Sequence, residues 1–390
     1  MTPDKLTSEQ RMMLAAVDRF TVERLEPRAA DIDESGLFSS ELYAEVAELG
    51  LLATMIPEAY GGIDVGVRTV MLAVERMARV SPGFAISVAN LGDGVSSVIH
   101  GATEDIKKAV LPEAASGQAI VAFALTEPGS GSDNASLRMK AIRDGDDYLL
   151  TGQKIYITNG SVSDYFTVYA RTSEDPRNGV SAFLVPRSAP GLSLGRDENL
   201  IGLRGTPASV VNFDSVRVPS DWRLGDEGDG FRLAMVSLDE ARLNISAIAL
   251  GICRRALDES IEFARNRVSF GQPIIRHQGI GFLLADLASE MAAAWSIFDR
   301  ALDAYENNEG RAASTLVSMA KLATTAAAMR ITTEAIQIHG GAGLTRDYIV
   351  EKLFRDAKAC QILDGTTQIQ ELIISRQLEK VGFPYEVLGW

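Results

Sequence analysis

Apolar residues at helical spacing dominate the first part of the chain. Thr7 and Gln10 have the spacing of a capping box, which marks the start of a helix. The apolar positions that follow fall on one face of a helix, at Met13, Ala16, Val17 and Phe20. Similar patterns predict further helices over residues 40–49, 68–79 and 103–114. We therefore predict an N-terminal helical domain over residues 1–118.

The pattern changes after Gln118, where short segments rich in β-branched and aromatic residues begin. Turn residues (Gly, Pro, Asn and Asp) separate these segments, which read AIVAFAL, YLLTGQKIYITN, YFTVYAR, VSAFLVP and ASVVNFDSVRVP. Such short strands, divided by turns, are typical of a small barrel or sandwich. Residues 119–228 are predicted to form a β domain.

Helical periodicity returns at Gly230 and continues through the rest of the chain. A long first run is followed by two more, over residues 277–306 and 311–339. Long helices with apolar stripes pack as a bundle, so residues 229–390 are predicted to form a C-terminal four-helix bundle. The expected fold class is α+β and mainly α, with a helical domain, a β domain and a helical bundle in that order.

Composition excludes some classes of partner. A net charge of -14 argues against a nucleic-acid partner, because phosphate neutralisation needs a basic face. Nor does the chain contain a run of about 18 apolar residues, so no membrane partner is expected. The first residues have neither the apolar core of a signal peptide nor the Arg-rich composition of a transit peptide.

The cysteines and histidines predict no metal centre. Cys253 and Cys360 lack CxxC spacing, which favours free thiols in a reducing compartment, and we expect the cytoplasm. His100, His277 and His339 have no HExxH or paired-cysteine context, so no metal site is predicted.

The most distinctive chemical feature is a lone carboxylate near the C-terminus. Asp364 follows Ile362 and Leu363 and precedes Gly365 and a predicted helix that starts near Thr366. The helix start would stabilise the anion, whereas apolar neighbours would raise the pKa of the carboxyl. This setting suits a general base, although a structural helix-terminal carboxylate has the same pattern.

A second acid is a weaker candidate. Asp93 lies in the sequence NLGDG, which predicts a turn between two helices. It is a candidate second acid in the same pocket, and the alternative is a structural turn aspartate.

Several motifs resemble signatures of the flavin-dependent acyl-CoA dehydrogenases. The quoted segments are LGLLATMIPEAYGG (49–62), ALTEPGSGSDNAS (124–136), KIYITNG (154–160), RNRVSFGQPIIRHQ (265–278) and QIHGGAGLTRDYIVEKLFRDAKACQILDGTTQIQ (from residue 337). Together they cover essentially the whole chain. The resemblance implies the three-domain fold given above and an FAD cofactor.

The resemblance also implies two sets of FAD contacts. The flavin set is Phe123, Leu125, Thr126, Ser132, Tyr156 and Thr158, with Thr366 and Gln368 from the segment that follows Asp364, here called the base turn. The second set, for the FAD of a neighbouring subunit, is Arg267, Ser269, Phe270, Gln278, Gln337, Gly340 and Gly341. A subunit-crossing site implies a homo-oligomer, expected to be a tetramer. From the residues alone, Tyr156 also fits a β-domain core aromatic, and Arg267 a solvated helix end.

By the same resemblance, the acyl-CoA substrate would contact Ser132, Asp239, Arg242, Leu363 and Gly365. For Asp239 and Arg242 the alternative is a surface ion pair on a helix, and the residues do not decide between the two.

The implied reaction is α,β-desaturation of an acyl thioester. Asp364 would remove the α proton while a hydride leaves the β carbon for flavin N5, and an acceptor such as an electron-transfer flavoprotein would take the electrons. The family mostly has Glu at this position, and some relatives use a helix position that Ala241 fills here. The shorter base and Leu363 favour a short, branched or cyclic acyl group. The alternatives are an acyl oxidase, a dehydrogenase of carrier-protein-bound acyl groups, and a non-catalytic flavin-binding homologue.

Overall fold

The first domain is a set of packed helices that starts at the predicted capping box. The structure is a computed structural model that describes residues 5–175 and 178–383. Its N-terminal helices are α1 (Ser8–Phe20), α2 (Ala29–Ser35), α3 (Ser40–Glu48), α4 (Val67–Ala78), α5 (Pro82–Gly101) and α6 (Glu104–Ala115). The Thr7 side chain accepts from the backbone N–H of Gln10, and the Gln10 side chain accepts from the backbone N–H of Thr7. The predicted helix start is confirmed.

Helix α5 corrects one prediction. Asp93 lies inside this helix and not in a turn between two helices. The glycines on either side of it serve close packing, because a Cβ at Gly94 would lie 1.9 Å from the carbonyl oxygen of Val121. A Cβ at Gly92 would lie 3.1 Å from Oε1 of Glu240. Gly92 and Gly94 therefore mark the contacts of α5 with β1 (Val121–Ala124) and with helix α7 (Gly230–Asn266).

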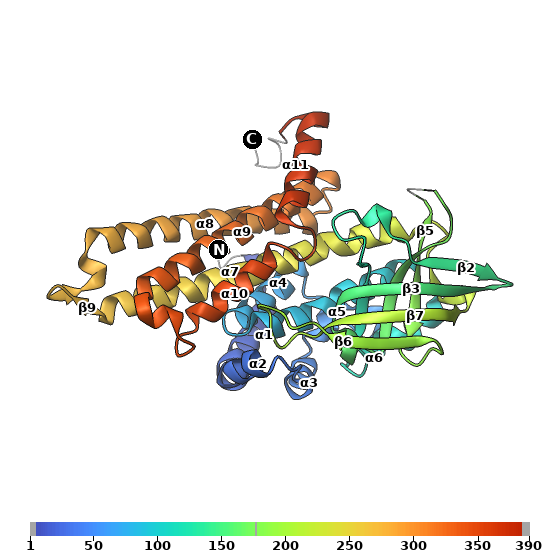
Figure 1. Ribbon diagram of the computed structural model, residues 1–390, viewed down its shortest axis with the longest axis horizontal. Coiled ribbons are helices and arrows are strands. Elements are labelled where there is room, and N and C mark those ends of the chain that lie inside the picture. The colour runs from blue at the N-terminus through green and yellow to red at the C-terminus, as the bar shows by residue number, and fades with distance from the viewer. Residues whose placement is uncertain (1–4, 176–177, 384–390) are drawn as a thin grey trace.

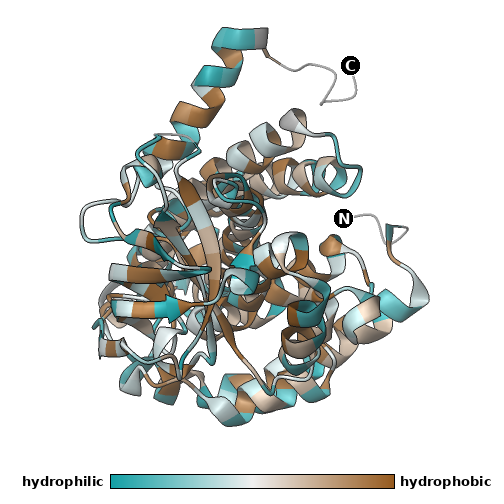
Figure 2. Cartoon of the chain, turned by 90° about the vertical axis from the view of Figure 1, so that its right-hand side faces the viewer, coloured by the Kyte–Doolittle hydropathy of each residue, from teal (hydrophilic) through white to brown (hydrophobic). Residues whose placement is uncertain are grey.

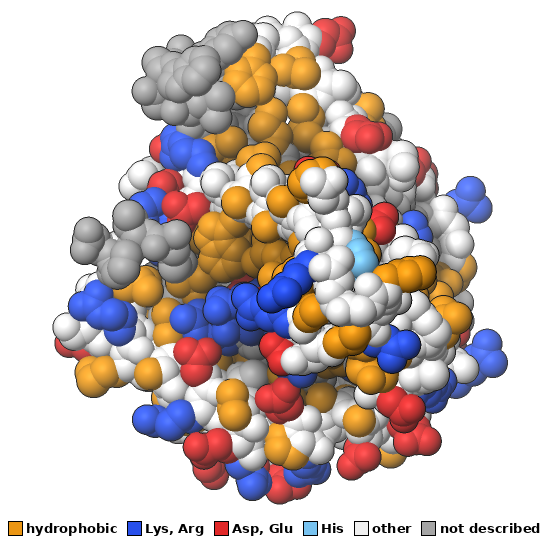
Figure 3. Space-filling model, turned by 90° about the vertical axis from the view of Figure 1, so that its left-hand side faces the viewer, with side chains coloured by type: hydrophobic (Ala, Val, Ile, Leu, Met, Phe, Trp, Pro, Cys, Tyr) orange, Lys and Arg blue, Asp and Glu red, His pale blue; other side chains and the backbone are white. Residues whose placement is uncertain are grey.

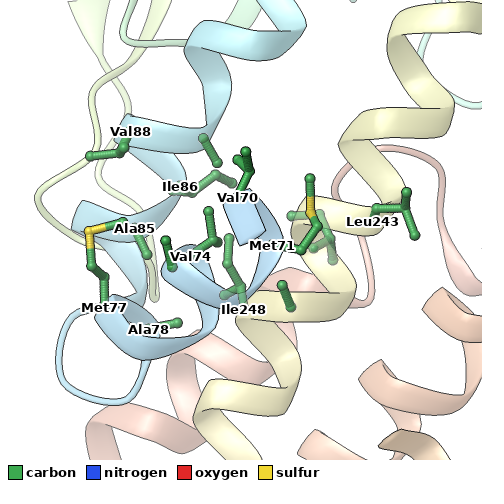
Figure 4. Close-up of a cluster of buried hydrophobic side chains, with 14 of the residues drawn as sticks. Val70, Met71, Val74, Met77, Ala78, Ala85, Ile86, Val88, Leu243 and Ile248 are labelled. Atoms are coloured by element: carbon green, nitrogen blue, oxygen red, sulfur yellow. The ribbon is translucent and has the colours of Figure 1, made fainter. Parts of the chain in front are cut away.

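Apolar side chains join α5 to its neighbours. Figure 4 shows residues of α4 and α5 packed against Leu243 and Ile248 of α7 (Gly230–Asn266). Val74 and Ile248 are fully buried in this cluster. The predicted boundary between the N-terminal helices and the bundle is thus bridged by a continuous apolar core.

The middle of the chain forms an eight-stranded sheet. Its strands are β1 (Val121–Ala124), β2 (Lys140–Asp144), β3 (Asp147–Thr158), β4 (Tyr165–Arg171), β5 (Val180–Pro186), β6 (Leu192–Asp197), β7 (Ala208–Val218) and β8 (Arg223–Leu224). The order is β6-β7-β3-β2-β4-β5-β8, and β1 pairs with β4 in parallel. The register of β3 against β7 shifts between Lys154 and Ile157, which places Tyr156 in a bulge.

The C-terminal part is built from long helices. After α7 come the short strands β9 (Val268–Ser269) and β10 (Gln272–Pro273), then α8 (Gln278–Glu306), α9 (Arg311–His339), α10 (Val350–Cys360) and α11 (Thr367–Val381). Figure 1 shows α7, α8 and α9 running together along the long axis, with the β9 end on the left and the sheet on the right. Figures 1 and 2 show α11 standing out from the rest of the chain.

Helix α8 carries apolar residues on its surface. By length and composition it could cross a membrane, and only 17% of its most apolar window is buried. Its Asp299 and Asp303 form ion pairs with Arg68 of α4, which packs α8 against the N-terminal domain. The exposed apolar face of α8 therefore needs another explanation.

Candidate active site

Asp364 lies in the turn between α10 and α11. Its φ angle is 52°, a left-handed backbone conformation that is uncommon for a residue with a side chain, and Gly365 continues the turn with a φ angle of 92°. The residue is partly buried. Burial raises the pKa of the Asp364 carboxyl, while the positive charges of Lys321 and Arg242 lower it. The Asp364 carboxyl is therefore partly shielded from water and lies near two cations, Lys321 and Arg242.

Asp93 of α5 is an electrostatic neighbour of Asp364. It is 6% exposed and accepts hydrogen bonds from Asn90 Nδ2 at 3.2 Å and from Asn244 Nδ2 at 3.4 Å. Burial, followed by the charges of Asp364 and Glu240, raises the pKa of Asp93 well above its usual range. Asp93 therefore holds its proton more tightly than an isolated carboxyl does.

Asp239 and Arg242 form an ion pair, but it is not on the surface. Arg242 is 5% exposed, and its Nη1 lies 2.6 Å from Oδ1 of Asp239. Ser314 of α9 also donates to that oxygen, at 3.1 Å. The guanidinium Nε is buried without a hydrogen-bond partner within the described residues. The pair thus holds a buried cation near Asp364 with one donor still available.

The structure brings the two predicted flavin segments together at the sheet. The backbone N–H of Ile155 donates to the carbonyl of Thr126 at 3.0 Å. The fully buried Lys154 donates to the carbonyl of Leu125 at 2.9 Å and to Glu127 at 2.8 Å. Leu125 and Thr126 therefore lie beside the bulge that carries Tyr156, with Thr158 at the end of the same strand.

This edge of the sheet suits an aromatic cofactor. The Tyr156 side chain is 58% exposed and its φ angle is 57°, so it does not fill the β-domain core. A Cβ added at Gly129 or Gly131 would meet no atom within 4 Å, which leaves the nearby backbone open to a ligand. An exposed ring, open glycines and the hydroxyls of Thr126 and Thr158 fit a flavin that is stacked and hydrogen-bonded at its edge.

The other predicted flavin and substrate residues differ in how exposed they are. Leu363 packs against the main core, and Thr366 is the N-cap residue of α11, with no hydrogen bond from its side chain to the helix start. Ser132 and Gln368 are exposed, and Phe123 is partly buried with its ring 5.1 Å from that of Tyr169.

The second predicted FAD set gathers at the far end of the bundle. Arg267 caps α7, and the β9–β10 hairpin that follows carries Phe270, which is 95% exposed. The ring of Phe263 in α7 stacks on His339 of α9 at 4.3 Å, which brings the Gly340 turn to the same end. Exposed Gln337, Gly340 and Gly341 lie there, with Ser269 and Gln278 near the hairpin. Figure 3 shows Lys and Arg side chains beside apolar patches on this face.

Three buried charged residues near the predicted site escaped the sequence prediction. Lys321, Lys154 and Glu127 are each less than a tenth exposed. Lys321 donates to the carbonyl of Leu363, Lys154 donates to the carbonyl of Leu125, and Glu127 accepts from Lys154. A signal existed for Lys321, since it is the only charged residue between Arg311 and Arg330. A single charge within an apolar helical run points to a buried partner.

The geometry brings acids and cations together at the turn of Asp364 and leaves a sheet edge open for an aromatic cofactor. Models of the acyl-CoA dehydrogenase N-terminal, middle and C-terminal domains match residues 7–118, 122–216 and 228–379. The chain therefore belongs to the acyl-CoA dehydrogenase family. The predicted family, fold class, oxidoreductase class and FAD cofactor are confirmed.

Individual relatives are similar over nearly their full length. Cyclohexane-1-carbonyl-CoA dehydrogenase of Geobacter metallireducens is 40% identical, over 96% of this chain and 98% of the relative. A chain solved in work on the electron transferring flavoprotein of Acidaminococcus fermentans has a TM-score of 0.93 and 33% identity, and covers 96% of this chain and 99% of its own. A glutaryl-CoA dehydrogenase of Mycobacterium smegmatis, solved with FADH2, has a TM-score of 0.91 and 29% identity, with 98% of each chain covered.

Proposed function

We propose that this enzyme desaturates the Cα–Cβ bond of an acyl-CoA and that Asp364 is the base. The observation that carries the proposal is the position of Asp364, which is partly buried in a turn that faces Lys321, Arg242 and Asp93. The carboxylate takes the α proton, the β carbon loses a hydride, and the electron pair left at the α carbon forms the new double bond. FAD, when bound, accepts that hydride at N5 and later passes two electrons to an acceptor.

The chain's own residues hold the flavin and the thioester. Tyr156 offers an aromatic face, and Thr126 and Thr158 offer hydroxyls, to the ring. As the α proton leaves, negative charge develops on the thioester oxygen, and the backbone N–H of Asp364 is the expected donor to it. Arg242, with its available Nε–H, is expected to meet the CoA part.

A cyclic acyl group is the favoured substrate. The relative from Geobacter metallireducens acts on cyclohexane-1-carbonyl-CoA, and this chain is 40% identical to it. An Asp base is also shorter than Glu by one C–C bond, about 1.5 Å, so the α carbon must lie closer to the turn. Turnover should be highest with cyclohexane-1-carbonyl-CoA or a short acyl-CoA, and best activity on an acyl chain of about twelve carbons or more would contradict this substrate class.

The base assignment has a direct test. Anaerobic mixing with substrate should bleach the flavin of the wild-type enzyme, and Asp364→Asn should lose about 100-fold or more in that rate. The variant keeps the size of the side chain, so its flavin spectrum should stay that of the wild type. A variant that bleaches at the wild-type rate would refute Asp364 as the base, and wild-type protein that never bleaches would favour a non-catalytic homologue.

We also propose an assembly and a setting for the reaction. The second FAD set lies at the β9 end of the molecule, whereas the flavin set lies at the sheet and at the start of α11 (Figure 1), which supports a homo-oligomer, expected to be a tetramer, whose neighbouring copies complete each site. An electron-transfer flavoprotein is the favoured acceptor, supported by the solved chain from Acidaminococcus fermentans. Fast oxygen consumption by the reduced enzyme would instead favour an oxidase.

We propose a cytoplasmic location for the enzyme. The thiols of Cys253 and Cys360 are free and buried, and free thiols are typical of a reducing compartment such as the cytoplasm.

A further inference from the structure

A buried lysine holds the turn that carries Asp364. Lys321 is 1% exposed, and its Nζ donates to the carbonyl of Leu363 at 2.5 Å and to the carbonyl of Gly365. One ammonium group therefore binds the residues immediately before and after the base. Gln370 adds a second support, since its Nε2 donates to the Gly365 carbonyl at 2.8 Å.

This turn needs such support. Asp364 and Gly365 both have positive φ angles, and a left-handed conformation at Asp364 is maintained only when its surroundings determine it. Carbonyl groups that converge on one cation are a specific way to do so, because the ammonium has three donors and tolerates little displacement. If the ammonium were lost, the two carbonyls would repel each other and the turn could relax.

The same lysine is an electrostatic neighbour of the base. Burial lowers the pKa of Lys321 to about 8, and the charge of Asp364 opposes that shift. The titratable and charged groups that neighbour Lys321 are Asp364 of the turn, Cys360 of α10 and Arg242 of α7. Asp364 in turn neighbours Asp93 of α5, and Asp93 neighbours Glu240 of α7.

We propose that Lys321 is a positioning residue that fixes the turn of Asp364 and keeps its carboxylate ionised for proton removal. This inference rests on the proposed function, because it assigns Lys321 a role only if Asp364 is the base. Lys321 does not touch the reacting carbons in this role; it acts through the backbone on either side of Asp364.

The proposal makes a prediction for the unmodified enzyme. The lysine charge is present well below pH 8, is half lost at about pH 8 and is absent well above it. The kcat of the wild type should therefore fall between about pH 7 and pH 9, one unit on either side of the lowered lysine pKa. A kcat that stays flat over this range overturns the proposal without any variant.

Substitutions separate the charge from the hydrogen bonds. In Lys321→Met, kcat should fall about 10-fold to 100-fold because the base is misplaced, while KM changes by less than about threefold. The low-pH side of the kcat/KM profile, here called the acid limb, should also move up by about one pH unit. The reason is that a nearby cation no longer favours the Asp364 carboxylate. Lys321→Gln can still donate to one carbonyl, so it should recover part of kcat but keep the displaced acid limb. Lys321→Arg keeps the charge and should return the limb toward the wild type.

Matched controls isolate the role. Lys352→Met removes another buried lysine, one that pairs with Asp356 at 2.7 Å, and should lower the melting temperature but leave the acid limb in place. Flavin absorbance checks the fold of each variant. Lys321→Met with wild-type kcat and acid limb overturns the inference, and so does a Lys352→Met variant with the same displaced limb. If Asp364→Asn keeps turnover, the proposed function fails; if it is inactive while Lys321→Met is normal, only the role of Lys321 fails.

Discussion

At the scale of single residues, the site balances buried acids against buried cations. Asp364, Asp93 and Glu240 would repel one another if all were ionised, and burial raises the pKa of each. Lys321 and Arg242 act against this effect at Asp364 only. The two cations favour the ionised form of Asp364, which distinguishes the proposed base from its acidic neighbours.

The pH dependence of the wild type should report this balance. Proton removal needs the Asp364 anion, and burial raises the pKa of Asp364, so kcat/KM should fall as the pH drops through a value above the ordinary aspartate pKa of about 3.9. The measurement is kcat/KM from about pH 4 to pH 8 with a fixed acyl-CoA. A limb at or below the ordinary aspartate value would contradict the buried setting of the base.

Arg242 offers a test at the same scale. Arg242→Met should leave Asp239 without its cation partner and should cost about 3 kcal/mol in the free energy of unfolding, because a half-removed buried pair leaves an uncompensated charge. It should also shift the acid limb of kcat/KM to higher pH. The measurements are urea unfolding and a pH profile. Arg242→Lys keeps the charge, and a limb as displaced in the Lys variant as in the Met variant would exclude a charge effect.

At the scale of elements, helix α5 positions the second acid through its glycines. Gly94 lets the helix approach β1, and Thr167 of β4 donates to the Gly94 carbonyl at 2.8 Å. Ser237 of α7 donates to the Asp93 carbonyl at 2.7 Å. Asp93 thus lies on a helix fixed between the sheet and the bundle, and not on a mobile turn.

Gly94→Ala tests this packing. The added Cβ would overlap the Val121 carbonyl, so α5 must move away from β1, and we expect a loss of about 3 kcal/mol in unfolding free energy. Gly279→Ala in α8 is the matched control, since its Cβ would meet no atom within 4 Å and it should be neutral or slightly stabilising. Equal urea midpoints for the two variants would show that α5 does not need the close contact.

The elements also show what a sequence does and does not determine. The capping box at Thr7 was predictable because its chemistry is local, within three residues. The glycines beside Asp93 were misread because glycine serves turns and close helix packing alike, and only the neighbouring strand distinguishes them. The partners of Lys321 lie 42 and 44 residues away, so its contact with the base turn has no local pattern. Asp364 was proposed as the base from its motif, whereas the charges around it could not be predicted from the sequence.

At the scale of the whole molecule, exposed apolar surface remains where a second copy would pack. Helix α11 projects from the chain (Figure 2), with Leu372 40% and Leu378 42% exposed. Phe282 of α8 is 64% exposed, and Phe270 in the hairpin is 95% exposed. Apolar surface of this kind on a monomer commonly marks an interface.

Charge substitution on α11 tests this arrangement. Leu372→Glu combined with Leu378→Glu should convert the oligomer to a smaller species and reduce the FAD that copurifies, because an ionised carboxylate in an apolar interface is unfavourable. Light scattering coupled to size exclusion gives the mass, and the ratio of flavin to protein absorbance gives the FAD content.

Ser375→Glu is the matched control for the same helix, since it adds a carboxylate at an exposed polar position. It should keep the wild-type mass and flavin content. If the leucine double variant also keeps both, α11 lies outside the interface and the exposed leucines have another role. If mass falls but flavin stays bound, the copies assemble through α11 while each chain holds its FAD alone, and the subunit-crossing site at Arg267 and Phe270 is wrong. Loss of both together is the result that a shared site requires, because the cofactor then depends on residues from two chains.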